Sequence, residues 1–186
     1  MSKLIKFSRG EMDDETAFAF PDLWEREEQP TWSRLRIGAR SGEVPLLLSL
    51  CHNCSGPFGI LYVLLVSRRG HEPGRYQAPE PVSLEALEQF LLGFREYLEQ
   101  DGRHHLWIRS MEDETQFVYD NHGLIYAYGP LDRIERQLAD RGFSPGSTEI
   151  PCPHSHHYHV EFDEDEDRLV RYWNWLHFPL QPTDDP

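Results

Sequence analysis

Residues 84–129, LEALEQFLLGFREYLEQDGRHHLWIRSMEDETQFVYDNHGLIYAYG, decide the fold class because they combine one clear helical pattern with three clear strand patterns. In the first part, leucine and phenylalanine recur at alternating intervals of three and four residues, which predicts an amphipathic helix from Leu84 to about Gln100. Ser83 is a suitable N-cap for this helix, and Gly102 is a suitable terminator.

Three strands are predicted in the second part, over 105–110, 115–120 and 123–129. The last two are joined by Asp120–Asn121–His122–Gly123, which is typical hairpin chemistry because asparagine and glycine tolerate positive φ. Such short connections favour antiparallel pairing, so the block indicates an antiparallel sheet with a helix packed on it.

The residues before this block also resemble strands. Polar and apolar side chains alternate from Trp32 to Ile37, which is typical of a half-buried strand. Two continuous apolar runs, Leu46–Cys51 and Phe58–Val66, are bounded by turn residues and indicate interior strands.

Two further helices and one strand are predicted after the block. Pro130 begins a helix that ends before Gly142, and another helix begins at about Glu164 with Asp163 as its N-cap. A strand over 157–162 lies between them. The fold class is therefore α+β: a mostly antiparallel sheet with about three helices packed on it, in the order βββ-α-βββ-α-β-α.

The chain of 186 residues fits a single domain. We expect residues 1–30 to be an acidic segment that is ordered only in part, residues 31–180 to form the α+β domain, and residues 181–186 to be a tail.

The net charge of −14, from 18 Lys and Arg against 32 Asp and Glu, argues against nucleic acid and anionic membranes as partners. The N-terminal residues lack the apolar core of a signal peptide, and no apolar stretch approaches the roughly 20 residues of a membrane span. Three cysteines do not suggest a disulfide framework. We therefore expect a cytoplasmic protein.

The segment 151–162, PCPHSHHYHVEF, holds four of the ten histidines. In an extended strand, His157, His159 and Glu161 share one face. Two imidazoles and a carboxylate can hold a divalent metal such as zinc, iron or manganese, and either histidine can serve as a catalytic base or nucleophile. The alternative is an ordinary polar face on a half-buried strand.

The same six residues, His157–Phe162, resemble the alternating histidine signature of the histidine-triad superfamily of nucleotide hydrolases and transferases. The resemblance implies that His159 is a nucleophile that attacks phosphorus. Glu161 departs from the signature, and its carboxylate would repel a phosphate. The chain is therefore not assigned to that superfamily.

A second candidate metal site starts from Cys51–His52–Asn53–Cys54, a C-x2-C pattern that supplies two thiolate ligands. Tetrahedral zinc needs four ligands, and Cys152 with His154 can supply the other pair. The alternative is a hairpin connection with free thiols, because a second C-x2-C is missing from the sequence.

Six of the seven residues from Glu161 to Asp167 are acidic, which exceeds what the N-terminus of a helix needs. The surplus fits a solvated face or a docking surface for a basic protein. The candidate partner-binding residues are Asp163, Glu164, Asp165 and Asp167.

Two functions follow from these observations. Because no complete catalytic motif is present in the sequence, we favour a small acidic protein-interaction module that neutralises or docks a basic partner. The alternative is a hydrolase or other enzyme, dependent on metal or on histidine, built on His157, His159 and Glu161.

Overall fold

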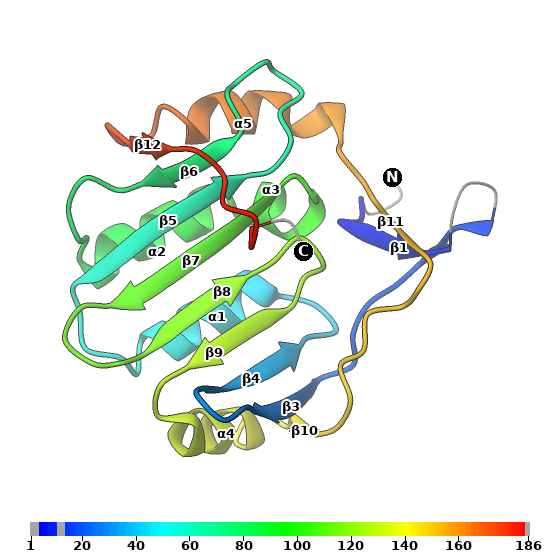
Figure 1. Ribbon diagram of the computed structural model, residues 1–186, viewed down its shortest axis with the longest axis vertical. Helices are drawn as coiled ribbons and strands as arrows, with labels where there is room; N and C mark the ends of the chain where they lie inside the picture. The colour runs from blue at the N-terminus through cyan, green and yellow to red at the C-terminus, as the bar shows by residue number, and fades with distance from the viewer. Residues whose placement is uncertain (1–3, 11–13, 185–186) are drawn as a thin grey trace.

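The computed structural model describes residues 4–10 and 14–184, and the described chain forms two β-sheets and five α-helices (Figure 1). The helices are α1 (Glu43–Cys51), α2 (Leu84–Gly93), α3 (Arg95–Gln100), α4 (Leu131–Ala139) and α5 (Asp163–Leu169), with a 3-10 turn η2 at Val160–Phe162. The strands are β1 (Phe7–Arg9), β2 (Thr16–Ala17), β3 (Leu23–Glu28), β4 (Ser33–Gly38), β5 (Phe58–Leu64), β6 (Gly74–Gln77), β7 (His104–Ser110), β8 (Gln116–Tyr119), β9 (Ile125–Tyr128), β10 (Ser144–Pro145), β11 (His154–His156) and β12 (Leu176–Phe178).

The large sheet has nine strands in the order β10-β3-β4-β9-β8-β7-β5-β6-β12, and the small sheet has the order β11-β1-β2. Every pair of neighbours is antiparallel except β10 with β3, which is parallel. The prediction of an α+β fold with a mostly antiparallel sheet is confirmed, although the number of helices and the exact order are not matched.

The predicted strand over Leu46–Cys51 is wrong, because these residues belong to helix α1. Six of the nine residues of α1 are buried, so the helix lacks the polar face that would have revealed its period. Pro45 lies in its first turn, where the missing N–H costs nothing. The first turn is also capped from outside, since Val44 N donates to Glu99 Oε1 of α3 at 3.0 Å.

The predicted helix over residues 84–100 divides into α2 and α3 at Phe94, whose ψ of 15° leaves the helical range. Its predicted N-cap is confirmed, because the Ser83 side chain accepts a hydrogen bond from Ala86 N at 3.2 Å. The predicted central strands are also confirmed as β7, β8 and β9, and Gly123 in the last turn has a φ of 84°.

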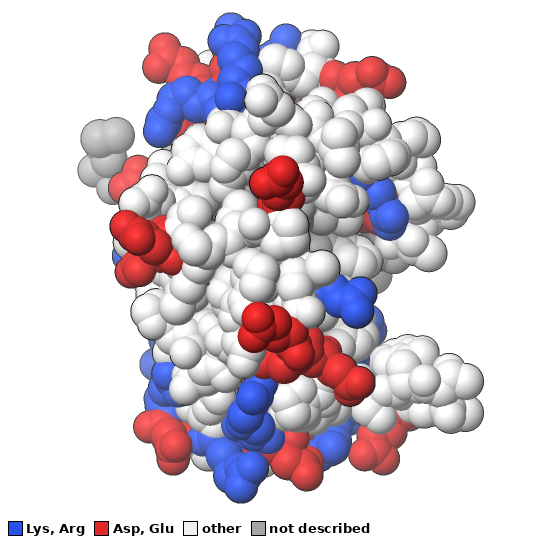
Figure 2. Space-filling model, turned by 90° about the vertical axis from the view of Figure 1, so that its left-hand side faces the viewer, with Lys and Arg blue, Asp and Glu red and all other residues white. Residues whose placement is uncertain are grey.

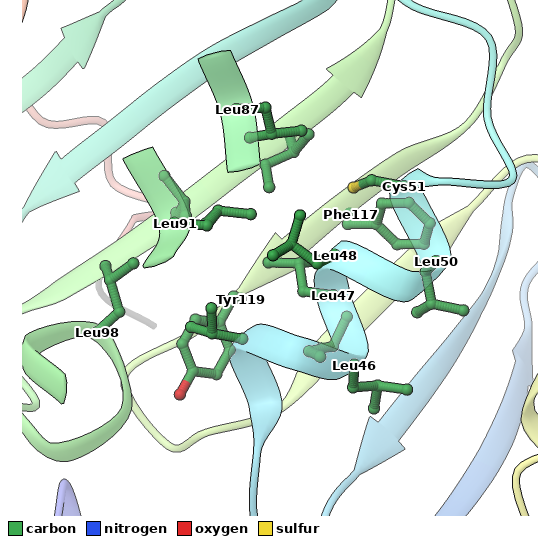
Figure 3. Close-up of a cluster of buried hydrophobic side chains, with 14 of the residues drawn as sticks. Leu46, Leu47, Leu48, Leu50, Cys51, Leu87, Leu91, Leu98, Phe117 and Tyr119 are labelled. Carbon is green, nitrogen blue, oxygen red and sulfur yellow. The ribbon is translucent and has the colours of Figure 1, made fainter. Parts of the chain in front are cut away.

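Helices α1, α2 and α3 lie behind the large sheet and cover one of its faces (Figure 1). Between them and the sheet lies the main core, in which leucines of the helices meet Phe117 and Tyr119 of β8 (Figure 3). Leu47, Leu87 and Leu91 are at most 1% exposed. Because full burial of one leucine side chain contributes about 1.5–3 kcal/mol, this layer is a major source of stability.

Part of the acidic N-terminal segment belongs to the sheets. Strand β3 pairs along its whole length with β4, and β1 pairs with β11 near the other end of the chain. The small sheet stands at one side of the large one (Figure 1). No helix in residues 4–10 and 14–184 is long and apolar enough to cross a membrane.

The strand predicted over 157–162 is wrong. The histidine strand β11 lies earlier, at His154–His156, and Val160–Phe162 form the 3-10 turn η2. Strand β11 ends at His156 because the backbone that follows forms hydrogen bonds with residues 101 and 102. Gly102 N donates to His157 O at 2.9 Å, and His159 N donates to Asp101 Oδ2 at 2.8 Å. Helix α5 then begins at Asp163, which is its first residue rather than the predicted N-cap.

Candidate metal centre

Three histidines from distant parts of the chain meet beside the small sheet. His122 lies in the turn between β8 and β9, and His154 and His156 lie on β11. One ring nitrogen from each histidine lies within 4.8 Å of the other two. Among residues 4–10 and 14–184, no other group of three or more histidine, cysteine or acidic side chains is gathered in this way. We call it the three-histidine cluster.

Two of the rings are oriented by hydrogen bonds at Nδ1. His122 Nδ1 donates to Asp120 Oδ2 at 3.1 Å, and His154 Nδ1 donates to the Pro151 carbonyl at 2.9 Å. Metal-binding histidines are held in this manner, because a proton on Nδ1 leaves the lone pair of Nε2 available for the ion.

The free nitrogens of these two rings face one another at 3.3 Å. When both rings are neutral with the proton on Nδ1, neither Nε2 atom of His122 and His154 can donate, and two lone pairs lie opposed. A cation between them would remove the repulsion. Two ligands that are each about 2.05 Å from a tetrahedral zinc are separated by about 3.3–3.4 Å, which is the spacing found here.

His156 completes the cluster. Its Nδ1 is buried without a hydrogen-bond partner in the described chain, and its Nε2 lies 3.5 Å from Asn121 Nδ2. Burial, together with the neighbouring His122 and His154, lowers the pKa of His156 to about 4. The ring is therefore neutral at pH 7, which is the form that binds a metal.

An apolar shell surrounds the cluster. The ring of Phe7 is 3% exposed, and its centroid lies 5.6 Å from His122, 6.1 Å from His154 and 6.4 Å from His156. Phe18 and Phe20 pack behind Phe7 at centroid distances of 5.4 and 5.9 Å. Such packing restricts the rings and lowers the local dielectric, which strengthens an ion's interactions.

A hollow of about 300 Å³ adjoins the cluster and is lined by His122, Lys6, Phe18, Arg40 and other residues. Lys6 Nζ donates to the Asp120 carbonyl at 2.9 Å and lies 3.9 Å from the centroid of Tyr119. Burial lowers the pKa of Lys6 to about 8, so this lysine remains mostly protonated at pH 7. The hollow therefore combines a histidine, a buried ammonium group, the carboxylates of Glu43 and Glu99, and apolar walls.

The predicted set of His157, His159 and Glu161 is not assembled on one strand face. His157 Nε2 is hydrogen-bonded to Ser8 Oγ at 2.9 Å, and His159 Nε2 donates to the Ile5 carbonyl at 2.8 Å. Glu161 is exposed in η2. The two histidines hold the N-terminal strand in place.

The predicted zinc set of Cys51, Cys54, Cys152 and His154 is not gathered either. Cys51 is the buried last residue of α1, Cys152 is exposed, and all three cysteines are free. Cys54 Sγ donates to Leu50 O at 3.5 Å, and burial raises the pKa of both Cys51 and Cys54. Of this set, His154 alone belongs to the three-histidine cluster.

Most of the acidic run is paired within the molecule. Asp163 accepts from Arg68 Nε at 3.0 Å, Asp167 accepts from Arg69 Nε at 3.1 Å, and Asp165 accepts from Arg168 Nη1 at 2.6 Å. Acidic and basic side chains accordingly lie together at the top of the molecule, around α5 and the 65–73 segment (Figures 1 and 2). Of the four predicted partner-binding residues, Glu164 remains exposed.

The sequence contained part of the signal for the cluster. His122 falls in a turn that was predicted from Asp120–Gly123, and His154 and His156 have the two-residue spacing of one strand face. Local patterns could not show that the two segments meet, because β11 reaches the turn by pairing with β1.

Comparison of the chain with protein-family models, curated proteins and solved structures finds no match. What the three-histidine cluster can do chemically is therefore inferred from its geometry.

Proposed function

We propose that this protein binds a divalent transition metal, with zinc as the best match, through His122, His154 and His156. The observation that carries the proposal is the pair of opposed Nε2 atoms at 3.3 Å, each on a ring whose Nδ1 is already hydrogen-bonded. Imidazole ligands suit zinc, copper, iron and nickel, and the tetrahedral spacing favours zinc among them.

We further propose that the bound ion is a hydrolytic centre. Structural zinc sites are closed by four protein ligands, whereas catalytic sites have three and leave one position for water. The three-histidine cluster supplies three, and the adjoining hollow gives space for a substrate. A metal in this position would lower the pKa of its bound water and supply hydroxide near neutral pH.

The chain's own groups can assist this chemistry. Asp120 holds the ring of His122, and Lys6 lines the hollow with a buried ammonium group. Such a preorganised cation stabilises negative charge that develops on a substrate oxygen during hydrolysis. The substrate class that fits is a small ester, amide or phosphoester.

The docking of a basic protein on Asp163, Glu164, Asp165 and Asp167 has less support. Three of these four carboxylates already accept hydrogen bonds from arginines of the same chain. A basic partner would have to compete with those contacts.

Metal analysis tests the binding proposal. The purified protein should bind about one equivalent of zinc, measured by elemental analysis and by titration against a chromogenic chelator. His122→Ala and His156→Ala should each weaken the affinity strongly. His52→Ala, which alters an exposed histidine outside the cluster, should leave it unchanged. Equal affinity in all three variants would refute the assignment.

Hydrolysis is tested separately with p-nitrophenyl esters and phosphoesters. We expect turnover that a chelator removes and zinc restores, with a reduced kcat in Lys6→Met. Stoichiometric zinc without turnover of any probe would refute the catalytic role and leave the metal site intact.

A further inference from the structure

A second hollow lies on the face of the large sheet opposite helices α1–α3. Side chains alternate along a strand, and Leu106 and Ile108 of β7 belong to the core, so Trp107 and Arg109 project from the other face. The hollow measures about 450 Å³, a size at which small organic molecules are bound. It lies on a different part of the fold from the three-histidine cluster, and the two share no lining residue.

The sheet register builds the floor of this hollow. Trp107 pairs with Leu61 of β5, and Leu61 pairs with Gln77 of β6, so the three side chains form a row across three strands. In the next row, Arg109 pairs with Gly59 on one side and with Gln116 of β8 on the other. The floor is thus part of the most extensively paired region of the sheet and is rigid.

The charge of the lining is opposite to that of the whole protein. None of the lining residues is acidic, although the chain has 32 aspartates and glutamates, and Arg109 is exposed at the rim. Within residues 4–10 and 14–184, no ion pair is described for Arg109. The neighbouring Arg75 differs, because Asp184 accepts two hydrogen bonds from it at 2.8 and 2.6 Å. The hollow therefore presents a cation without its counterion.

The walls combine apolar surface with a few polar groups. Trp107, Leu61, Met111, Pro79 and Pro81 supply the apolar part. The indole Nε1 of Trp107 is buried and has no hydrogen-bond partner in the described structure.

Gly59 keeps the hollow open. A glycine inside a strand weakens the sheet and often marks a place where another molecule approaches the backbone. A Cβ at position 59 would lie 3.3 Å from Met111 Sδ, on a flexible side chain, so a larger residue can be accommodated by the fold. Beyond Cβ, its side chain would enter the space that Arg109 and Trp107 face.

From these observations we propose that the hollow binds a small organic carboxylate with an aromatic or aliphatic body. The carboxylate pairs with the Arg109 guanidinium, which matches its planar, two-oxygen geometry. The body lies against Trp107 and Leu61, and the amides of Gln77 and Gln116 are close enough along the rows to fix its orientation. This ligand is independent of the proposed metal.

The test uses 3-phenylpropionate as the probe and 3-phenylpropionamide as its uncharged counterpart. The nitrogen-15 NMR signal of the Trp107 indole N–H, assigned with Trp107→Phe, should shift saturably with the carboxylate. The amide should bind at least about tenfold more weakly, because it lacks the charge that Arg109 recognises.

Three variants sharpen the test. Arg109→Gln should weaken binding of 3-phenylpropionate about tenfold or more, and Gly59→Leu should abolish it by filling the hollow. Arg171→Gln removes a different exposed arginine and should leave the affinity unchanged. Far-UV circular dichroism checks that each variant is folded. The proposal is overturned if the Trp107 signal does not shift up to the solubility limit of the probe, if the amide binds equally well, or if folded Arg109→Gln retains full affinity.

Discussion

Replacement of Arg103 by methionine is expected to remove about 3–5 kcal/mol from the free energy of unfolding. Arg103 is 0% exposed and lies where β7 begins. Its Nε and Nη2 atoms donate to the two carboxylate oxygens of Asp101 at 2.7 and 2.8 Å, and Nη2 also donates to the His159 carbonyl at 2.8 Å. Its Nη1 donates to Glu166 of α5.

The magnitude follows from what the variant leaves behind. Asp101 and Glu166 are both 0% exposed, and methionine fills the space of the guanidinium's stem without neutralising either carboxylate. Removal of one partner from a buried ion pair costs about 3–5 kcal/mol, because the remaining charge is neither solvated nor paired. The variant leaves two buried carboxylates without the guanidinium, so we expect a loss of stability in the upper half of that range.

Equilibrium unfolding in urea measures the effect, and a double-mutant cycle identifies its cause. Glu166→Gln should destabilise the unaltered protein. In the Arg103→Met background it should instead restore stability, because it removes a buried negative charge that has lost its partner. Arg69→Met, which breaks an exposed pair with Asp167, should cost about 0–1 kcal/mol. A loss below about 1 kcal/mol in Arg103→Met, or additivity in the cycle, would refute the reasoning.

Three further predictions concern metal, pH and helix capping. Zinc at about one hundred times its dissociation constant should raise the free energy of unfolding by about 2.7 kcal/mol, and calorimetry should show no such gain in His154→Ala. Burial between Tyr62 and Tyr97 holds the pKa of His104 well below its ordinary 6.5. The contribution of the neutral imidazole to the free energy of unfolding is therefore complete above pH 6.5 and declines as the pH falls. Urea titrations from pH 7 to pH 5 should therefore show a shallower loss of stability in His104→Gln than in the unaltered protein; equal slopes would contradict this assignment. Glu99→Ala removes the carboxylate that caps α1 and should cost about 1 kcal/mol in urea unfolding, whereas Glu96→Ala, at an exposed position of α3, should cost little.

Elements with a one-sided pattern could be predicted from the sequence. Ser83 marks the start of α2, and Gly123 marks the turn between β8 and β9, because both signals are local. Helix α1 could not be identified in the same way. Its leucines are buried against both the sheet and the neighbouring helices, and a segment that is apolar all round has no visible period.

The candidate site was only partly visible for a different reason. The clustering of histidines in 151–162 was apparent, but its face depends on where β11 begins, and a shift of register changes which side chains share a face. The burial of individual residues in the acidic run 161–167 could not be predicted from the sequence either. Nothing in its composition distinguishes Glu166, which is fully buried against Arg103, from the exposed Glu164.

The pairing of β1 with β11 also sets the order in which the molecule can be completed. Phe7 pairs with His156, and the nearby contact between Ser8 and His157 spans 149 residues of chain. Closing a loop of that length costs about 4 kcal/mol of chain entropy, and contacts so distant in sequence generally form late in folding. Since β11 carries two of the three histidines, the metal centre would be among the last parts to form. A metal ion would then stabilise a chain that has already folded, and would contribute little to guiding its collapse.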